Sequence, residues 1–383
     1  MAGKNRIHQT ELNLGQKKSH AIIKVIGVGG GGGNAVNRMI EVGLQGVDFI
    51  AMNTDAQVLD VSDADIKIQL GQNVARGLGV GGDPTAGRSA AEESRSEIVE
   101  YLDGADLVFI TAGMGGGTGT GAAPVIAEIA KDCGALVVAV VTKPFKFEGP
   151  RRARIAADGA ANLREKVDTM IQINNDRLVD ISERTTTLID AFKAADDVLR
   201  SGVQSISDII QVAGNINVDF ADVRAIIQRA GTALMGIGKG TGENRARQAA
   251  EAAVSSHLLD SSIRGATRIL VNVTSSRDLT VHELGECMDY VYQLADQDDA
   301  NIIMGHVFDE NMIDMVQVTV LATGFPTGAP LPEPVVEVAA PEPFVATEAR
   351  RRGTAEVAIE EPSPAAPPKE DRELPAFLRR QRL

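Results

Sequence analysis

The sequence predicts an α/β protein in which a doubly wound parallel sheet is followed by a long central helix, a second α+β domain and a disordered C-terminal tail. Two observations predict the sheet. Short apolar runs alternate with stretches of helical spacing over the first half of the chain, as in parallel strands joined by helices. Three of the connections after an apolar run are rich in glycine, and sheets of this kind bind ligands at the carboxyl ends of their strands.

The stretch 113–121 organises this region and reads Gly-Met-Gly-Gly-Gly-Thr-Gly-Thr-Gly. It lies between an expected strand at 106–112 and an expected helix at 122–131. Because side chains are nearly absent, the backbone N–H groups are accessible, and the helix adds the positive end of its dipole. Thr118 and Thr120 add hydroxyl donors. We interpret the stretch as a phosphate-binding turn, against the alternative of a merely flexible glycine turn.

The other elements of the first domain follow in order. Residues 1–20 are polar and are expected to be disordered. A second glycine-rich turn at 29–34 precedes a helix at 35–40, and a third at 77–84 precedes a helix at 87–103. The expected strands are 21–28, 47–52, 66–70, 106–112, 135–141 and 168–173.

These turns are compatible with two functions of different classes. The pattern GxGxxG occurs at Gly27, Gly29 and Gly32, and Asp55 lies near the position of a ribose-binding acid, which suits a dinucleotide-dependent oxidoreductase. Three glycine-rich turns are more than a dinucleotide needs, and they suit a triphosphate held from several sides. The sequence lacks GxxxxGK[ST], so a Walker-type site is not expected. A nucleotide hydrolase that assembles and an oxidoreductase therefore remain as alternatives.

Two charged residues follow the apolar strand 135–141. Glu148 and Arg152 flank the loop at its carboxyl end, where they could reach a ribose and a phosphate. The alternative is a solvated pair of charges. Pro150 lies between them and suits the first turn of the next helix.

The second half of the chain begins with an expected helix at 188–212. Asp196 and Asp197 lie near its start, where pairing with the helix dipole would already explain two acids. Asp219 and Asp222 can cap a helix that starts near residue 221. A loop at 236–242, a helix at 243–258 and strands at 267–274, 301–308 and 316–322 complete the α+β domain.

The composition argues against several classes of function. The net charge of −14 disfavours a protein that binds nucleic acid by neutralising its backbone. Cys133 and Cys287 have no CxxC spacing, and the five histidines are scattered, so neither a disulfide framework nor a protein metal site is expected. The start lacks an apolar leader and no stretch has the apolar length of a membrane span, so we expect a cytoplasmic protein without direct membrane insertion.

The composition changes after residue 325. Residues 326–370 are rich in Pro, Ala, Glu, Val and Thr without helical or strand periodicity, which predicts a disordered linker. Residues 371–383 end the chain with an apolar and basic peptide. We expect it to bind partner proteins, although an inert terminus is the plain alternative.

Several of these motifs together resemble the FtsZ family of tubulin-type GTPases from bacterial cell division. They are the glycine stretches 115–121 and 29–34, Phe-Lys-Phe-Glu-Gly at 145–149, the spacing of Asn217, Asp219 and Asp222, and Pro-Ala-Phe-Leu-Arg at 375–379. The resemblance covers roughly residues 21–325 and the last dozen. It implies a GTPase whose subunits stack head to tail into filaments that form a cytokinetic ring at midcell.

The resemblance also implies site residues by position. Asp219 and Asp222 would be catalytic, acting on the nucleotide of the next subunit. Glu148 and Arg152 would contact the sugar side and Asp196 the guanine edge. The residues implied to hold the rest of the nucleotide are Gly30, Gly31, Gly32, Gly33 and Asn34, with Gly117, Thr118 and Gly119 at the phosphates.

The implied ligands are GTP or GDP with Mg²⁺, which would be held mainly by the phosphates. The implied partners are further copies of the chain and membrane-adaptor and regulator proteins, which would bind through Leu374, Phe377, Leu378 and Arg379. The expected domains are 1–20 (N-terminus), 21–187 (GTP binding), 188–212 (central helix), 213–325 (α+β with the catalytic loop), 326–370 (linker) and 371–383 (partner-binding peptide).

Overall fold

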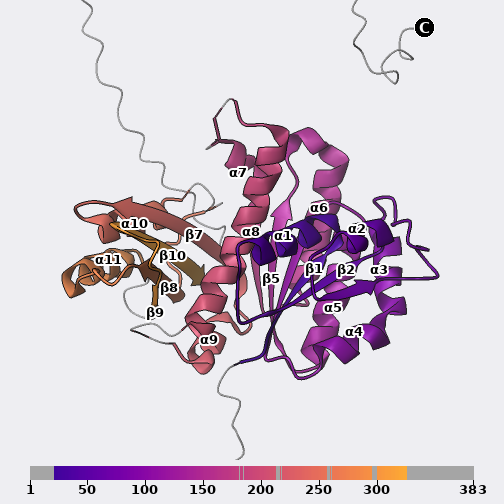
Figure 1. Ribbon diagram of the computed structural model, residues 1–383, viewed down its shortest axis with the longest axis horizontal. Coiled ribbons are helices and arrows are strands. Elements are labelled where there is room, and N and C mark those ends of the chain that lie inside the picture. Colours follow the sequence, from indigo (N-terminus) through magenta and orange to yellow (C-terminus); the bar gives the residue numbers. More distant parts are fainter. Residues whose placement is uncertain are drawn as a thin grey trace, which may run out of the picture. The chain divides into compact units, whose positions relative to one another are not determined.

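The structure is a computed structural model of the full chain (Figure 1). It describes residues 21–180, 182–183, 185–212, 216, 218–256, 259, 261–295 and 300–325, all within one compact unit, Met1–Val336. The expected N-terminal segment 1–20, linker 326–370 and peptide 371–383 lie outside the described residues.

The first half of the chain forms a parallel sheet in the order β3-β2-β1-β4-β5-β6. Its strands are β1 (Ile23–Val28), β2 (Asp48–Asn53), β3 (Ile66–Gln69), β4 (Leu107–Gly113), β5 (Leu136–Lys143) and β6 (Thr169–Asn174). Neighbouring strands are parallel throughout, and Val28 at the end of β1 pairs with Ala112 near the end of β4. The two glycine-rich connections that follow these strands therefore start side by side.

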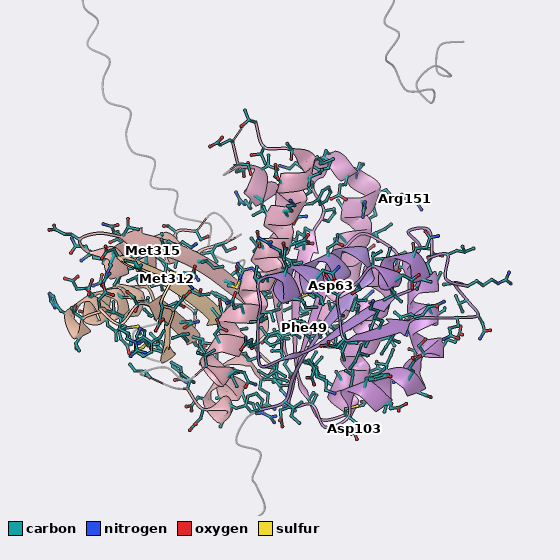
Figure 2. The ribbon with its side chains drawn as sticks, in the orientation of Figure 1. Phe49, Asp63, Asp103, Arg151, Met312 and Met315 are labelled. Atoms are coloured by element: carbon teal, nitrogen blue, oxygen red, sulfur yellow. The ribbon has the colours of Figure 1, made fainter. Side chains whose placement is uncertain are left out.

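Helices cover both faces of this sheet, so the predicted doubly wound architecture is confirmed. One face packs on α3 (Pro84–Glu93), α4 (Arg95–Leu102), α5 (Thr118–Asp132) and α6 (Pro150–Arg164). The other packs on α1 (Gly29–Glu41), α2 (Ala56–Asp60) and α8 (Leu188–Gln211). Short helices lie at η1 (Lys146–Glu148) and α7 (Asn175–Asp180). Figure 2 shows Phe49 within the layers, and it is buried, whereas Asp103 and Arg151 lie at the periphery and are exposed.

The helix α8 connects the two halves of the fold. It has 24 residues, and its apolar side chains share one core with β1, β5 and β6 and with side chains of the second sheet. It is followed by α9 (Phe220–Ile227). The predicted long central helix is thus present almost over its full expected range.

The second sheet has the order β7-β10-β8-β9 and carries α10 (Arg245–Val254) and α11 (Val281–Leu294) on a third core. Its strands are β7 (Gly231–Thr241), β8 (Arg268–Ser275), β9 (Asn301–Phe308) and β10 (Met315–Thr323). β6 and β7 pair in parallel over three residue pairs, which joins both sheets into one of ten strands. The predicted α+β character is confirmed.

The loop predicted at 236–242 is wrong, because β7 continues to Thr241. A Cβ at Gly236, Gly238 or Gly240 would collide with backbone carbonyl oxygens of α10. These glycines alternate along the strand, so together they form a face without side chains on which α10 packs closely.

Two further boundaries differ from the prediction for physical reasons. α1 begins at Gly29, immediately after β1, so residues 29–34 are helical rather than a turn. Gly29 has φ +72°, which lets the chain change direction within one residue. The helix expected at 87–103 is two helices that meet at Ser94, whose hydroxyl accepts a hydrogen bond from the Gly71 N–H at 3.0 Å.

Candidate nucleotide site

A pocket of about 400 Å³ lies at the carboxyl ends of β1, β4 and β5. Its walls come from the start of α1, the turn between β4 and α5, the start of α6 and the N-terminal half of α8. This is the edge at which a doubly wound sheet binds its ligands. The nine predicted residues that line it are Gly30, Gly31, Asn34, Gly117, Thr118, Gly119, Glu148, Arg152 and Asp196.

One end of the pocket is built for an anion. The N-termini of α1 and α5 both line it, and neither helix has an acidic residue in its first turn. A Cβ at Gly30 or Gly116 would meet nothing within 4 Å, so both glycines face open space. Two helix dipoles and accessible backbone N–H groups therefore converge where phosphates would be stabilised.

The two threonines of the glycine stretch have different positions. Thr118 lines the pocket, and its Oγ1 lies 2.7 Å from Oγ1 of the buried Thr54. Thr120 is buried behind the turn, where its Oγ1 accepts a hydrogen bond from the Gly115 N–H at 2.8 Å. Only Thr118 can thus supply the hydroxyl donor that the sequence predicted for both.

Glu148 and Arg152 form a pair at the rim. Glu148 Oε2 lies 2.9 Å from Arg152 Nη1, and Glu148 Oε1 accepts a hydrogen bond from the Phe145 N–H at 2.8 Å. The side chain of Glu148 is 10 % exposed and that of Arg152 is 52 % exposed. The alternative of two solvated charges is therefore wrong for Glu148, which is held in place by the short helix η1.

The opposite end of the pocket is formed by one face of α8. Phe192, Asp196 and Leu199 lie one turn apart along it, and all three line the pocket. The pKa of Asp196 is raised to about 7, because burial disfavours the ionised form and the neighbouring Asp197 adds negative charge. Arg38 acts in the opposite direction, and its Nε lies 2.9 Å from Asp197 Oδ1.

Phe192 and Asn175 line the pocket but were not predicted. The signal for Phe192 is its position four residues before Asp196, which places both on one helix face. The ring of Phe192 also makes edge contacts with Phe145 and Phe147. Asn175 Oδ1 is buried without a hydrogen-bond partner among the described residues, so it is an acceptor available to a bound ligand. No sequence pattern distinguishes it.

Four predicted residues lie away from the pocket. Gly32 packs on the carbonyl group of Thr111 in β4, where a Cβ would collide, and Gly33 lines a small separate cavity between α1 and β2. Neither glycine is therefore among the residues that line the pocket. Asp219 and Asp222 lie at the start of α9 and are exposed.

The described residues contain no group of three or more His, Cys, Asp or Glu that could hold a metal ion. Within the same part of the chain, no helix is both long and apolar enough to cross a membrane.

Two family models match the chain: the GTPase domain of the Tubulin/FtsZ family over residues 22–183, and the C-terminal domain of the FtsZ family over residues 231–326. An empty FtsZ dimer from M. jannaschii is 42% identical with a TM-score of 0.78, covering 85% of this chain and 95% of that one. The chain belongs to the FtsZ family. As a member of this family it is a GTP hydrolase and binds a guanine nucleotide.

Other solved structures agree with this assignment. A mutant FtsZ from M. jannaschii is 45% identical with a TM-score of 0.77, covering 80% of this chain and 92% of that one. CetZ2 from Haloferax volcanii, solved as a GTPγS-bound protofilament, is 20% identical with a TM-score of 0.66, covering 79% and 93%, and shows the fold alone. The oxidoreductase alternative finds no support. Residues 184–230, which include Asp196, Asp219 and Asp222, lie between the two matched domains of the FtsZ family.

Proposed function

We propose that this chain polymerises head to tail into filaments that form the cytokinetic ring at midcell in the cytoplasm, and that GTP is hydrolysed where two subunits meet. The observation that carries the proposal is the position of Asp219 and Asp222. They follow the C-terminal end of α8, whereas the pocket lies at the N-terminal half of that helix. Figure 1 shows α7 and α9 at opposite ends of α8.

The length of α8 separates the two sets of residues. A helix of 24 residues spans about 36 Å, and the part that follows Asp196 spans on the order of 20 Å. The segment after α8 is fixed to the second sheet, because the His306 N–H of β9 donates to the Ile216 carbonyl at 3.1 Å. This separation supports a role of Asp219 and Asp222 on the nucleotide of a neighbouring subunit rather than on that of their own. A head-to-tail contact of this kind gives open filaments.

The two acids are available for such a role. Asp219 occupies the N-cap position of α9, yet its side chain makes no capping hydrogen bond. Neither Asp219 nor Asp222 has a side-chain hydrogen bond or ion pair with any described residue. A purely structural role as helix caps therefore lacks the contact that it needs. We assign them the orientation of the attacking water on the phosphates of the next subunit.

The residues that line the pocket support one pose of the nucleotide. The N-termini of α1 and α5 and the hydroxyl of Thr118 would hold the phosphates, with Glu148 and Arg152 beside the sugar. Asp196 would accept from the N1–H and amino group of guanine, a donor pair that adenine lacks. Asn175, whose Oδ1 has no partner among the described residues, and Phe192 also line the pocket.

Mg²⁺ would be held mainly by the phosphates and by water. The described residues offer no carboxylate cluster, and the hydroxyl of Thr118 lines the pocket at the start of α5, 2.7 Å from the hydroxyl of Thr54. This donor set fits Mg²⁺, which keeps several waters and binds with substrate phosphates. Bound there, the ion would neutralise charge on the transferred phosphoryl group.

Exposed apolar side chains near the pocket support a contact with a second subunit. Val179, Leu188 and Ile189 are at least half exposed, and so is Phe147. They belong to η1, α7 and the start of α8, which border the pocket. Apolar groups gathered at the rim of a site are typical of a protein interface.

The test is a mixing experiment. Asp222→Ala is expected to bind GTP with wild-type affinity, to enter filaments and to hydrolyse very slowly. Mixed with wild type, it should lower turnover per wild-type subunit, because it supplies defective acids to its neighbours. Phosphate release over a range of protein concentrations should rise more steeply than linearly.

The matched control is Asp289→Ala, which removes an exposed acid from α11. It should neither slow hydrolysis nor inhibit the wild type. Turnover that is strictly proportional to protein concentration, or full activity of Asp222→Ala, would contradict a shared site.

A further inference from the structure

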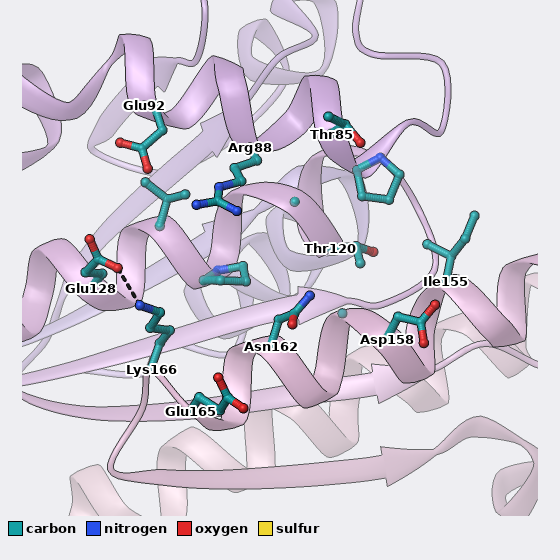
Figure 3. Close-up of a pocket in the computed structure, with 15 residues that line it drawn as sticks. Thr85, Arg88, Glu92, Thr120, Glu128, Ile155, Asp158, Asn162, Glu165 and Lys166 are labelled. Carbon is teal, nitrogen blue, oxygen red and sulfur yellow. Dashed lines mark hydrogen bonds and ion pairs between the residues drawn. The ribbon is translucent and has the colours of Figure 1, made fainter.

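A second cavity lies behind the phosphate turn, between α3, α5 and α6 (Figure 3). Its volume is about 380 Å³, close to the roughly 400 Å³ of the nucleotide pocket. Cavities of about this size hold small molecules. The sequence predicted no ligand for this cavity, although Thr120 and Gly121 of the glycine-rich stretch line it.

We propose that this cavity binds a zwitterionic small molecule with an apolar body, of the size of an amino acid or dipeptide, and that its occupant tightens nucleotide binding. The first part stands on the cavity itself. The second part rests on the proposed nucleotide function.

The charges around the cavity favour a zwitterion. Arg88 of α3 makes no hydrogen bond or ion pair with any described residue, and Figure 3 shows its side chain on the α3 side of the cavity, with Asn162 of α6 on the other side. Its planar fork of donors suits a carboxylate. Asp158 and Glu165 of α6 are equally without a partner in the described chain and suit an ammonium group.

The other charged groups of the cavity are already paired. Glu128 lies 2.7 Å from Lys166 and 3.1 Å from Arg95, and Glu92 lies 3.0 Å from Arg95. Pro124, Val125 and Ile155 add apolar surface to the lining of the cavity. A ligand with one anionic end, one cationic end and an apolar middle therefore matches the unpaired charges and the apolar side chains of the cavity.

The cavity is in direct contact with the phosphate turn. Thr120 belongs to its wall, and the same side chain accepts the hydrogen bond from the Gly115 N–H of the turn. A Cβ at Gly87 of α3 would collide with the carbonyl of Gly117, and one at Gly159 of α6 would collide with the methyl group of Thr120. α3 and α6 thus pack on the turn without intervening space.

This packing gives the direction of the effect. A ligand that bridges Arg88 and Asp158 holds α3 and α6 in place against the first turn of α5. The phosphate turn is then already more rigid, so it loses less conformational entropy when nucleotide binds. Coupling between two sites is reciprocal, so bound nucleotide must tighten the ligand by the same factor.

The site is tested by calorimetry on the full chain without nucleotide. The probe is trans-4-(aminomethyl)cyclohexane-1-carboxylate, which has both charged ends on an apolar ring. It is expected to bind, and its methyl ester and its N-acetyl derivative should each bind about tenfold more weakly or worse. Absence of binding at millimolar probe, or equal affinity of all three compounds, overturns the proposal.

Point variants locate the binding. Arg88→Gln and Asp158→Asn should each lower the affinity for the probe about tenfold. The matched control is Glu100→Gln, which removes an exposed charge of α4 that does not line the cavity. An unchanged affinity in both cavity variants, or an equal loss in Glu100→Gln, places the probe elsewhere and overturns the site.

The coupling is tested by repeating the titration with saturating GDP. The probe should bind about fivefold more tightly or better. Thr120→Val should remove this gain, and Thr120→Ser should retain it. No gain in the wild type overturns the coupling. A chain that fails to bind GDP overturns the proposed function with it, whereas the nucleotide-free titration still decides the site.

Discussion

Asp196 combines partial burial with a like-charged neighbour, and both raise the cost of ionising it. Its pKa of about 7 lies within the range in which the protein would work. In the proposed pose the ionised carboxylate would accept two hydrogen bonds from guanine, whereas the protonated form would first have to lose its proton. The charge of this one side chain would therefore link guanine recognition to pH.

The affinity for GDP is expected to rise from pH 6 to pH 8 and to fall about tenfold per unit well below pH 7. The sign follows from the raised pKa, because proton release must precede acceptance from the base. Asp196→Asn should bind GDP more weakly and lose this pH dependence. The measurement is GDP affinity of both proteins in the same buffers, so that titration of the nucleotide cancels in their ratio. If the affinities of the wild type and of Asp196→Asn change with pH in the same way, Asp196 does not contact the base.

At the scale of residues, the sequence predicted where a phosphate-binding edge lies better than it predicted the direction in which each residue faces. Glycine-rich turns at strand ends predicted a phosphate-binding edge, because the absence of side chains is visible in the sequence. The sequence did not show that Thr120 turns inward or that Gly32 faces β4, since both depend on contacts with distant strands and helices. Asn175 escaped prediction because a single amide carries no pattern.

At the scale of elements, β7 and α10 pack in close contact. Glycine in a strand is usually unfavourable, so the run from Gly236 to Gly240 resembles a loop in sequence. In the fold these glycines admit the backbone of α10, which is rich in alanine and equally small. The contact between the glycine face of β7 and the alanine-rich face of α10 depends on the tertiary fold, so local residue propensities do not predict it.

Gly238→Ala is expected to destabilise the chain by about 3 kcal/mol or more, because the added methyl group would collide with backbone of α10. The measurement is the urea midpoint of unfolding. The matched control is Gly285→Ala on the exposed side of α11, where a Cβ meets nothing within 4 Å. That change should stabilise the helix by about 0.5–1 kcal/mol. Equal midpoints for the two variants would contradict close packing of α10 on β7.

Strands and long helices were predictable because their apolar residues follow a regular period. The helix α11 was missed, although Thr280 and Glu283 form a capping box at its start. That signal is present in the sequence, since Thr-x-x-Glu before an apolar run marks a helix N-terminus. The division of 87–103 into α3 and α4 was not predictable, because it depends on the contact of Ser94 with Gly71.

At the scale of the whole molecule, we expect the peptide 371–383 to act independently of the GTPase. Leu374, Phe377 and Leu378 would dock on adaptor proteins, and Arg379 would add electrostatic attraction. Deletion of 371–383 should abolish capture of adaptors while phosphate release stays at the wild-type rate. Replacement of the same residues by a polar sequence of equal length is the control for tail length. Adaptor capture by the truncated chain would refute this role.

The seam between β6 and β7 has a mechanical consequence. Only three residue pairs between β6 and β7 join the two sheets. All other neighbouring strands pair over four to eight residues. The few hydrogen bonds between β6 and β7 offer little resistance to sliding of one sheet against the other. The helix α8, in contrast, has apolar contacts with both sheets. In a filament whose subunits meet at the two ends of α8, tension would therefore pass along this helix, and the sheet would follow its movement.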